Sequence, residues 1–147
     1  MTVHLIKLCV GIESVEHLQR FRKQRRLEQL AAGEAVESRH VTRMTPKRRD
    51  EVMDGGSLYW VIKGFIQVRQ KIKRLDVVYD NDGIRRCAIV MSPRLYRTEW
   101  QARRPFQGWR YFDPEDVPAD LPPGGKVTAA EQMPAEMRLE LQKLGLL

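Results

Sequence analysis

The chain has 147 residues, with 26 Lys and Arg against 19 Asp and Glu and a formal net charge of +7. Its length suits one domain with its own hydrophobic core, and its 42% hydrophobic and 31% charged residues are typical of a globular protein. No apolar run approaches the roughly 20 residues of a membrane-spanning helix, so we expect no membrane partner. The first residues lack the pattern of a signal peptide, so the expected location is the cytoplasm.

Basic residues are concentrated in the first three quarters of the chain. Residues 1–112 carry 23 basic and 12 acidic side chains, a net charge of +11, whereas residues 113–147 carry 3 and 7, a net charge of −4. This asymmetry favours a polyanionic partner, and a surface charge that only confers solubility is the alternative. Cys9 and Cys87 lie in apolar stretches, and no His or Cys pair has metal-ligand spacing, so neither a metal nor a cofactor is predicted.

In chain order, the first half of the sequence alternates between predicted strands and helices. An apolar stretch ended by Gly11 predicts the first strand. Ser14 is the expected cap of a long helix, and the basic run RKQRR interrupts the apolar stripe of this helix, so we expect a bend or break there. Pro46 is expected at the first position of a short helix. The predicted ranges are strand 3–10, helix 14–31, strand 36–44 and helix 46–53.

The second half is dominated by predicted strands. The β-branched and aromatic run that starts at residue 57 is expected to continue as one strand to residue 73, with a bulge or a close backbone approach at Gly64. An Asn-Asp-Gly turn predicts a hairpin, a Pro/Gly-rich arm should wrap the surface, and a stripe of Met and Leu predicts a final helix. These ranges are strands 75–79, 85–91 and 95–100, arm 103–125 and helix 134–144.

This order of elements predicts an α+β fold. We expect a small, curved or barrel-like mixed β-sheet with flanking helices. Residues 1–121 are expected to form a single α+β domain, and residues 122–147 a C-terminal tail that carries the amphipathic helix.

Three segments, HLIKLCVG near the start, TPKRRDEVMDGGSLYWVIKGFIQVRQKI in the middle and RRPFQGWRYFDPEDVPADL towards the end, carry a family resemblance. They resemble a family of alphaproteobacterial proteins that is defined only as a domain of unknown function. The resemblance covers about residues 3–121 and rests on the motifs GGSLYWVIKG, RQKI and FQGWRY. It implies a bacterial protein and assigns it no activity.

The short helix, the glycine turn and the strand with Lys63, Gly64 and Arg69 are also similar to the start of the PUA-like and ASCH-type β-barrels. That resemblance implies a small barrel that binds RNA or modified nucleotides in a cleft beside this strand. The chain departs from the ASCH pattern, because Lys63 precedes Gly64 and Gln67 stands where an acidic residue is expected.

Basic residues alternate along the strand predicted at 57–73. With a period of two, Lys63, Arg69 and Lys71 share one face, and cations spread over about 33 Å of strand suit a phosphate backbone. Trp60 is expected at the rim of this face, where it would stack on a base. The alternative is a solvated outer face whose reverse side packs against the core.

A second set of candidates lies in the arm, where aromatic residues alternate with arginines. Arg103, Arg104 and Arg110 would contact phosphates and Trp109 would stack on bases, as in proteins that bind single strands. The alternative is that Trp109 anchors the arm to the sheet while the arginines pair with acidic residues further along the chain.

A third set belongs to the short helix predicted to begin at Pro46. Arg48 and Arg49 would lie in its first turn, where positive charge opposes the helix dipole unless an anion binds there or acidic neighbours compensate. Nearby His40 could act as a general base, although the sequence shows no partner residue for it.

These three sets lead to a nucleic-acid-binding module as the leading hypothesis, with RNA as the expected partner and no catalytic residue assigned. A protein-interaction or regulatory module that docks through helix 134–144 is the alternative from another class. A third hypothesis is a nucleotide-processing enzyme that depends on Lys63 or His40. The sequence contains none of the common catalytic motifs.

Overall fold

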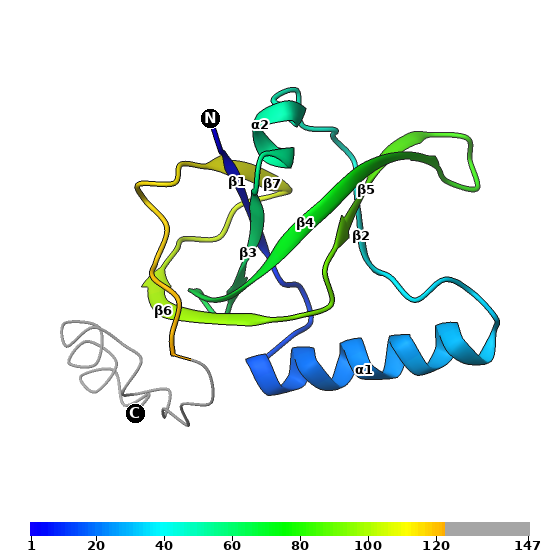
Figure 1. The fold of residues 1–147 in the computed structure, drawn as a ribbon, viewed down its shortest axis with the longest axis horizontal. Coiled ribbons are helices and arrows are strands. Elements are labelled where there is room, and N and C mark those ends of the chain that lie inside the picture. Colours follow the sequence, from blue (N-terminus) through cyan, green and yellow to red (C-terminus); the bar gives the residue numbers. More distant parts are fainter. Residues whose placement is uncertain (123–147) are drawn as a thin grey trace.

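The computed structural model describes residues 1–122, which form a seven-stranded mixed sheet with two helices beside it (Figure 1). The helices are α1 (Val15–Ala31) and α2 (Arg49–Met53). The strands are β1 (His4–Leu8), β2 (Ser38–Thr42), β3 (Ser57–Ile62), β4 (Phe65–Tyr79), β5 (Arg85–Met91), β6 (Tyr96–Ala102) and β7 (Trp109–Phe112). The expected α+β class is confirmed, and the sheet is open. The helix expected at 134–144 lies outside the described residues.

The long strand β4 organises the sheet. The strand order is β2-β5-β4-β3-β1-β7, and β6 also pairs with β4. The first part of β4 pairs with β3 and β6, and its second part, from Ile72 to Tyr79, pairs with β5. Irregular pairing interrupts the register near Ile72, and such bulges bend a strand. All of these pairs are antiparallel except β1 with β3, so the sheet is mixed as predicted.

A tight turn replaces the continuous strand expected at 57–73. Lys63 and Gly64 have φ angles of 52° and 83°, and Ile62 pairs with Phe65 directly across them. Two consecutive residues with positive φ are what a two-residue hairpin loop requires, so β3 and β4 form a hairpin. The prediction of one strand through Gly64 was therefore wrong. Lys63 lies at the tip of the turn and does not share a strand face with Arg69.

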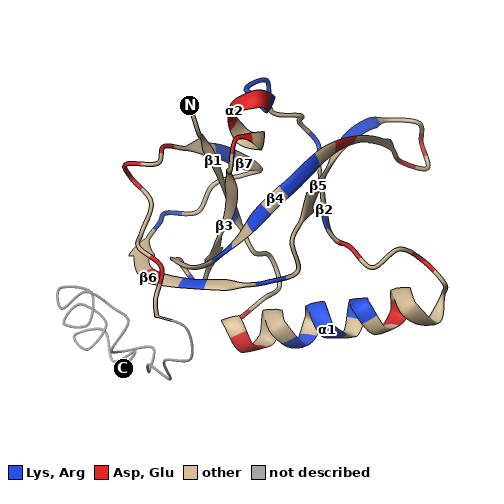
Figure 2. Cartoon of the chain, viewed as in Figure 1, with Lys and Arg blue, Asp and Glu red and all other residues tan. Residues whose placement is uncertain are grey.

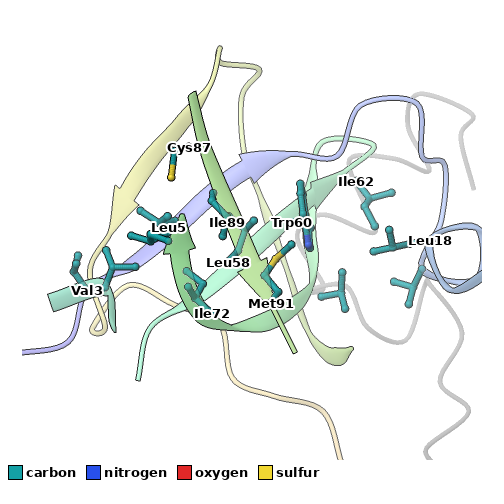
Figure 3. Packing of buried hydrophobic residues seen from close by; sticks show 14 residues of the cluster. Val3, Leu5, Leu18, Leu58, Trp60, Ile62, Ile72, Cys87, Ile89 and Met91 are labelled. Carbon is teal, nitrogen blue, oxygen red and sulfur yellow. The ribbon is translucent and has the colours of Figure 1, made fainter. Parts of the chain in front are cut away.

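The sheet separates two groups of buried side chains. The larger group lies on one face of the sheet and includes Leu5, Leu58, Trp60, Val68 and Met91. Figure 3 shows part of this group, with Leu58, Trp60 and Met91 from the sheet and Leu18, which joins it from α1. The smaller group lies on the other face, where Ile6, Tyr59, Val61, Ile66 and Phe112 pack beneath Phe106 and Val117 of the arm.

Helix α1 begins as the sequence predicts and continues without a break. The backbone N–H of His17 donates to the Ser14 hydroxyl at 3.0 Å, which is the expected N-cap. The helix then runs without interruption through the RKQRR segment to Ala31, so the expected bend is absent. Neither helix in the described part of the chain is long and apolar enough to cross a membrane.

Helix α2 is shorter than predicted. It begins at Arg49 rather than at Pro46, and its first turn contains Asp50 and Glu51. These carboxylates complement the helix dipole, so the expected conflict between basic residues and the dipole is largely removed. Gly56 follows the helix at a point of close approach, where an added Cβ would collide with the carbonyl oxygens of Val52 and Val3.

Candidate functional site

A cleft of about 680 Å³ lies between α1 and the sheet and is called the α1 cleft below. The inner face of α1 forms one wall, and the ends of β1 and β3 together with β2 form the other. Figure 1 shows α1 extending alongside the sheet, away from the hairpin of β4 and β5. The basic and aromatic residues in its lining are Lys7, His17, Phe21, Arg22, Arg25, Arg26, Arg39, His40 and Trp60.

The sequence of α1 explains why a cleft forms there. Positions spaced by three or four residues share one helix face. On the inner face, Val15 and Leu18 are buried in the core, but the next positions are Arg22, Arg25 and Arg26. The apolar stripe therefore ends after Leu18, and the same face continues as a basic stripe that lines the cleft.

The far end of α1 is fastened to the sheet by a polar contact. The Gln29 side chain donates from Nε2 to the carbonyl oxygen of Glu37 at 3.0 Å and accepts from the Glu37 N–H at 3.3 Å. Gln29 is only 8% exposed, and Glu37 immediately precedes β2. Both ends of α1 are thus held, the first by apolar packing and the second by this pair of hydrogen bonds.

Arg22 is the most unusual group in the cleft. Its Nε is buried without a hydrogen-bond partner, and within residues 1–122 its guanidinium forms no ion pair. Its contact is with the ring of Trp60, whose centroid lies 5.8 Å from Cζ. Burial lowers the pKa of Arg22, with a further lowering from Arg25 that the nearby Cys9 opposes. A half-buried cation without a carboxylate is costly to the protein unless a ligand supplies the missing charge.

His40 lies beside Arg22 and is neutral at physiological pH. The pKa of its imidazole is lowered to about 4. Burial is the largest cause, and the positive charges of Lys7 and Arg22 contribute the rest. The ring makes an edge contact with Trp60 at a centroid distance of 5.2 Å. Its Nε2 is buried and has no hydrogen-bond partner among residues 1–122.

Lys7 and Cys9 complete this cluster at the end of β1. Burial lowers the pKa of the Lys7 ammonium and raises the pKa of the Cys9 thiol to about 11, so the thiol stays protonated. A protonated, partly buried thiol is a poor nucleophile. Among residues 1–122, no group of three or more His, Cys, Asp and Glu could hold a metal ion.

The charge of the α1 cleft is strongly positive. Five Lys and Arg side chains line it, at positions 7, 22, 25, 26 and 39, against the two glutamates Glu34 and Glu37. Glu37 is already bound by Arg74 at 2.6 Å. Figure 2 shows the basic residues that follow one another along α1. An anion is therefore the ligand type that this lining favours.

The strand candidates are occupied by contacts within the protein. Arg69 binds Asp120 at 2.7 Å and the Ser57 hydroxyl at 2.8 Å, and its side chain is 16% exposed. Arg69 and Lys71 also lie over the ring of Tyr96, at 4.6 and 5.1 Å. Lys63 in the turn is 3.7 Å from a carboxylate oxygen of Glu13. The row of free cations expected on this strand is not present.

The two tryptophans differ from their predicted positions. Trp60 is only 2% exposed and donates from Nε1 to the buried Gln70 at 2.9 Å, so the expected exposed rim position was wrong. Trp109 is half-buried in β7, donates from Nε1 to the carbonyl oxygen of Met44 at 2.8 Å and packs edge-on against Tyr111. These contacts anchor the arm, as the alternative interpretation expected.

The three arm arginines do come together. Arg103, Arg104 and Arg110 line a second cavity of about 530 Å³, called the arm cavity below, with Phe106 and Phe112. The Arg110 guanidinium lies 4.8 Å from the Phe106 ring, and Arg103 lies 5.0 Å from the Phe112 ring. This site also contains Asp113 and Asp116, so it is less positive than the α1 cleft.

Arg48 and Arg49 do not form the expected anion site. Arg48 binds Glu51 at 2.6 Å, and its guanidinium lies over Tyr111 at 5.1 Å. Arg49 donates to the carbonyl oxygen of Leu75 at 2.8 Å. Both arginines serve contacts around α2.

Sequence reasoning missed the residues that the α1 cleft brings together. Lys7, Arg22 and Arg26 come from a strand and a helix whose relative placement no local pattern specifies. One signal was available, because the apolar stripe of α1 gives way to arginines on the same face after Leu18. We interpreted that change as a bend in the helix, whereas it marks the wall of a cleft.

One protein family, described as Protein of unknown function (DUF1489), has a model that matches residues 5–147. The chain belongs to this family. The match also includes residues 122–147, which we had expected to lie outside the family resemblance. No curated protein and no solved structure matches the chain. The likeness to PUA-like and ASCH-type barrels stays a prediction from sequence motifs.

Proposed function

We propose that this DUF1489 protein binds single-stranded nucleic acid, RNA in the first place, and that the α1 cleft holds phosphate groups of the strand. The observation that carries the proposal is Arg22, a half-buried guanidinium that has no carboxylate partner in residues 1–122. Guanidinium groups bind phosphate, as they bind carboxylate, with two parallel hydrogen bonds.

The lining of the cleft supports a nucleotide unit rather than a bare anion. Its volume of about 680 Å³ lies within the roughly 300–1,000 Å³ that ligand sites occupy. Apolar side chains such as Ile12, Phe21 and Val36 line it together with the arginines. Phe21 is 50% exposed, and an exposed aromatic ring beside cations can stack on an unpaired base.

The arm cavity is a second contact in this proposal. Lys7 lines the α1 cleft and Ile6 lines the arm cavity, so these neighbouring residues of β1 face opposite sides of the sheet. A short strand bound in one site does not reach the other directly. Arg103, Arg104 and Arg110 are therefore assigned to a separate, weaker contact with a longer strand.

Salt dependence of binding tests the proposal. For a short oligouridylate, the logarithm of the binding constant should fall linearly with the logarithm of the salt concentration, with a slope of about −0.7 for each phosphate neutralised. Arg22→Gln should weaken binding and reduce this slope by about 0.7.

Arg20→Gln is the matched control, because Arg20 is exposed on the same helix and does not line the cleft. This variant should bind like the natural protein. No binding by the natural protein, a salt-independent binding constant, or equal effects of the two variants would each contradict the proposal.

A further inference from the structure

We infer that Lys7, Arg22 and His40 form a site for a phosphomonoester, the doubly charged terminal phosphate of a nucleotide or of an RNA strand. The inference rests on the proposed function, because it names the group that the α1 cleft holds. It adds that the cleft distinguishes a terminal phosphate from the phosphodiesters inside a strand.

The three side chains lie close together although they come from different elements. Lys7 belongs to β1, Arg22 to α1 and His40 to β2, and all three line the α1 cleft. All three lie around Trp60: the Arg22 Cζ is 5.8 Å from the centre of its ring, the His40 ring is 5.2 Å from it, and Lys7 is the residue paired with Trp60 across β1 and β3. We therefore expect one small ligand in the cleft to contact all three side chains.

The charge of the cluster matches a dianion. Lys7 and Arg22 supply two positive charges, and neither forms an ion pair within the described part of the chain. A phosphomonoester carries about −1.5 to −2 charges near pH 7, whereas a phosphodiester carries one. The terminal phosphate neutralises both cations, and an internal phosphate would leave one of them uncompensated in a partly buried site.

The donors of the cluster also match three terminal oxygens. A guanidinium presents five N–H donors in a planar fork, and an ammonium presents three. The neutral imidazole of His40 adds a buried Nε2 that has no hydrogen-bond partner among residues 1–122. Because His40 is uncharged, it supplies a polar contact without adding a third positive charge to the site.

The walls of the cleft give the site a fixed shape. Val15 and Leu18 hold the first turns of α1 in the core, and Gln29 holds its last turns to the segment before β2. The loop from Cys9 to Ile12 and Pro93 complete the lining. A terminal nucleotide fits a space of this size, and the rest of a strand would continue out of it.

Binding of four probes tests the inference, measured by titration calorimetry at one salt concentration. The probes are a short oligouridylate with a terminal phosphate, the same strand with hydroxyl ends, uridine monophosphate and inorganic phosphate. We expect the phosphorylated strand to bind at least about tenfold more tightly than the hydroxyl strand, a ratio that corresponds to about 1.4 kcal/mol.

Two variants assign this ratio to the cluster. In Lys7→Gln and in Arg22→Gln the ratio should fall close to one, whereas the control Arg20→Gln should keep it. Thermal unfolding of each variant confirms that it is folded, and Lys7→Gln serves as the second test if Arg22→Gln does not fold. A ratio that persists in both folded variants would overturn the inference.

The outcomes separate the inference from the proposed function. Equal affinity of the natural protein for the two strands would overturn the inference and leave nucleic-acid binding in place. Tight binding of uridine monophosphate or inorganic phosphate without binding of either strand would support the phosphomonoester site and contradict nucleic-acid binding. Binding of none of the four probes would overturn both.

Discussion

In the proposed function, Arg22 is a side chain that reduces stability in favour of binding. Its guanidinium carbon lies 5.8 Å from the centre of the Trp60 ring, its Nε is buried, and it has no carboxylate partner among residues 1–122. Removing a charge from water costs free energy that only a partner can offset, and here the partner is proposed to be the ligand. In the unliganded protein this cost falls on the folded state.

Replacing Arg22 with Met should therefore stabilise the protein while weakening its binding to RNA. Methionine is unbranched and apolar, so it can pack beside Trp60, and it removes the charge that has no partner among residues 1–122. We expect the free energy of unfolding in urea to rise by about 1 kcal/mol. Arg20→Met on the exposed side of α1 should change it by less than about 0.5 kcal/mol. A loss of stability in Arg22→Met, larger than in the control, would show that Arg22 is a structural residue.

His40 should make the protein less stable in mild acid. Its pKa is about 4 in the folded protein and 6.5 ordinarily. Above pH 6.5 the imidazole is neutral in both the folded and the unfolded protein, so its burial does not lower the stability through its charge. As the pH falls below 6.5 the unfolded chain takes up the proton first, and stability is lost progressively until about pH 4.

The measurement is urea unfolding of the natural protein and of His40→Asn at pH 7 and pH 5. Between pH 7 and pH 5, His40 should lower the free energy of unfolding of the natural protein by up to about 2 kcal/mol. The decrease in the variant should be smaller by this amount. Carboxylates titrate mostly below this interval. The pKa of His4 is also lowered, by burial and by Arg69, so the variant keeps a smaller pH dependence in the same direction. An unchanged pH dependence in His40→Asn would contradict this assignment.

At the level of elements, the ends of α1 were predicted well, but the role of its inner face was not. Its N-cap at Ser14 and its end near Ala31 follow from local side-chain chemistry, which the sequence displays directly. The bend expected at the RKQRR run was wrong, because a polar residue on an inner face can line a cavity as well as interrupt a core. Only the placement of α1 against β2 distinguishes these two cases.

The hairpin of β3 and β4 shows a different limit of prediction. Strand residues lie on both sides of Lys63 and Gly64, so the local pattern is compatible with a single strand. The turn depends on a positive φ at Lys63, a conformation that lysine adopts less readily than glycine or asparagine. The candidate strand site could not be placed correctly without that turn.

The contact between Gln29 and Glu37 should hold the second half of α1 over the cleft. In Gln29→Ala both backbone groups of Glu37 lose their partner, so we expect a loss of about 1–2 kcal/mol in unfolding free energy. Amide hydrogen exchange should become faster in residues 22–31, while the turns that carry Val15 and Leu18 stay protected. The exposed Gln24 is the control position on the same helix. Equal exchange along all of α1, or an equal effect of Gln24→Ala, would contradict this role.

Across the described part of the molecule, the basic residues that alternation along the strand suggested are engaged by contacts within the protein. Lys63 and Arg69 each lie near a carboxylate, and Lys71 lies over the Tyr96 ring. Arg22, Arg26 and Arg39, which form no ion pair among residues 1–122, line the α1 cleft instead. Net charge could thus be predicted from composition, whereas its location required the packing of α1 against the sheet.

The central claim, that the α1 cleft binds the nucleic acid, is tested most directly by mapping backbone amide chemical shifts in NMR spectra during titration with a phosphorylated oligouridylate. The account expects the largest shifts at the end of β1, along the inner face of α1 and in β2, with saturation of all three at the same strand concentration. Shifts confined to residues 103–112 of the arm, or no shifts in any described element, would contradict it.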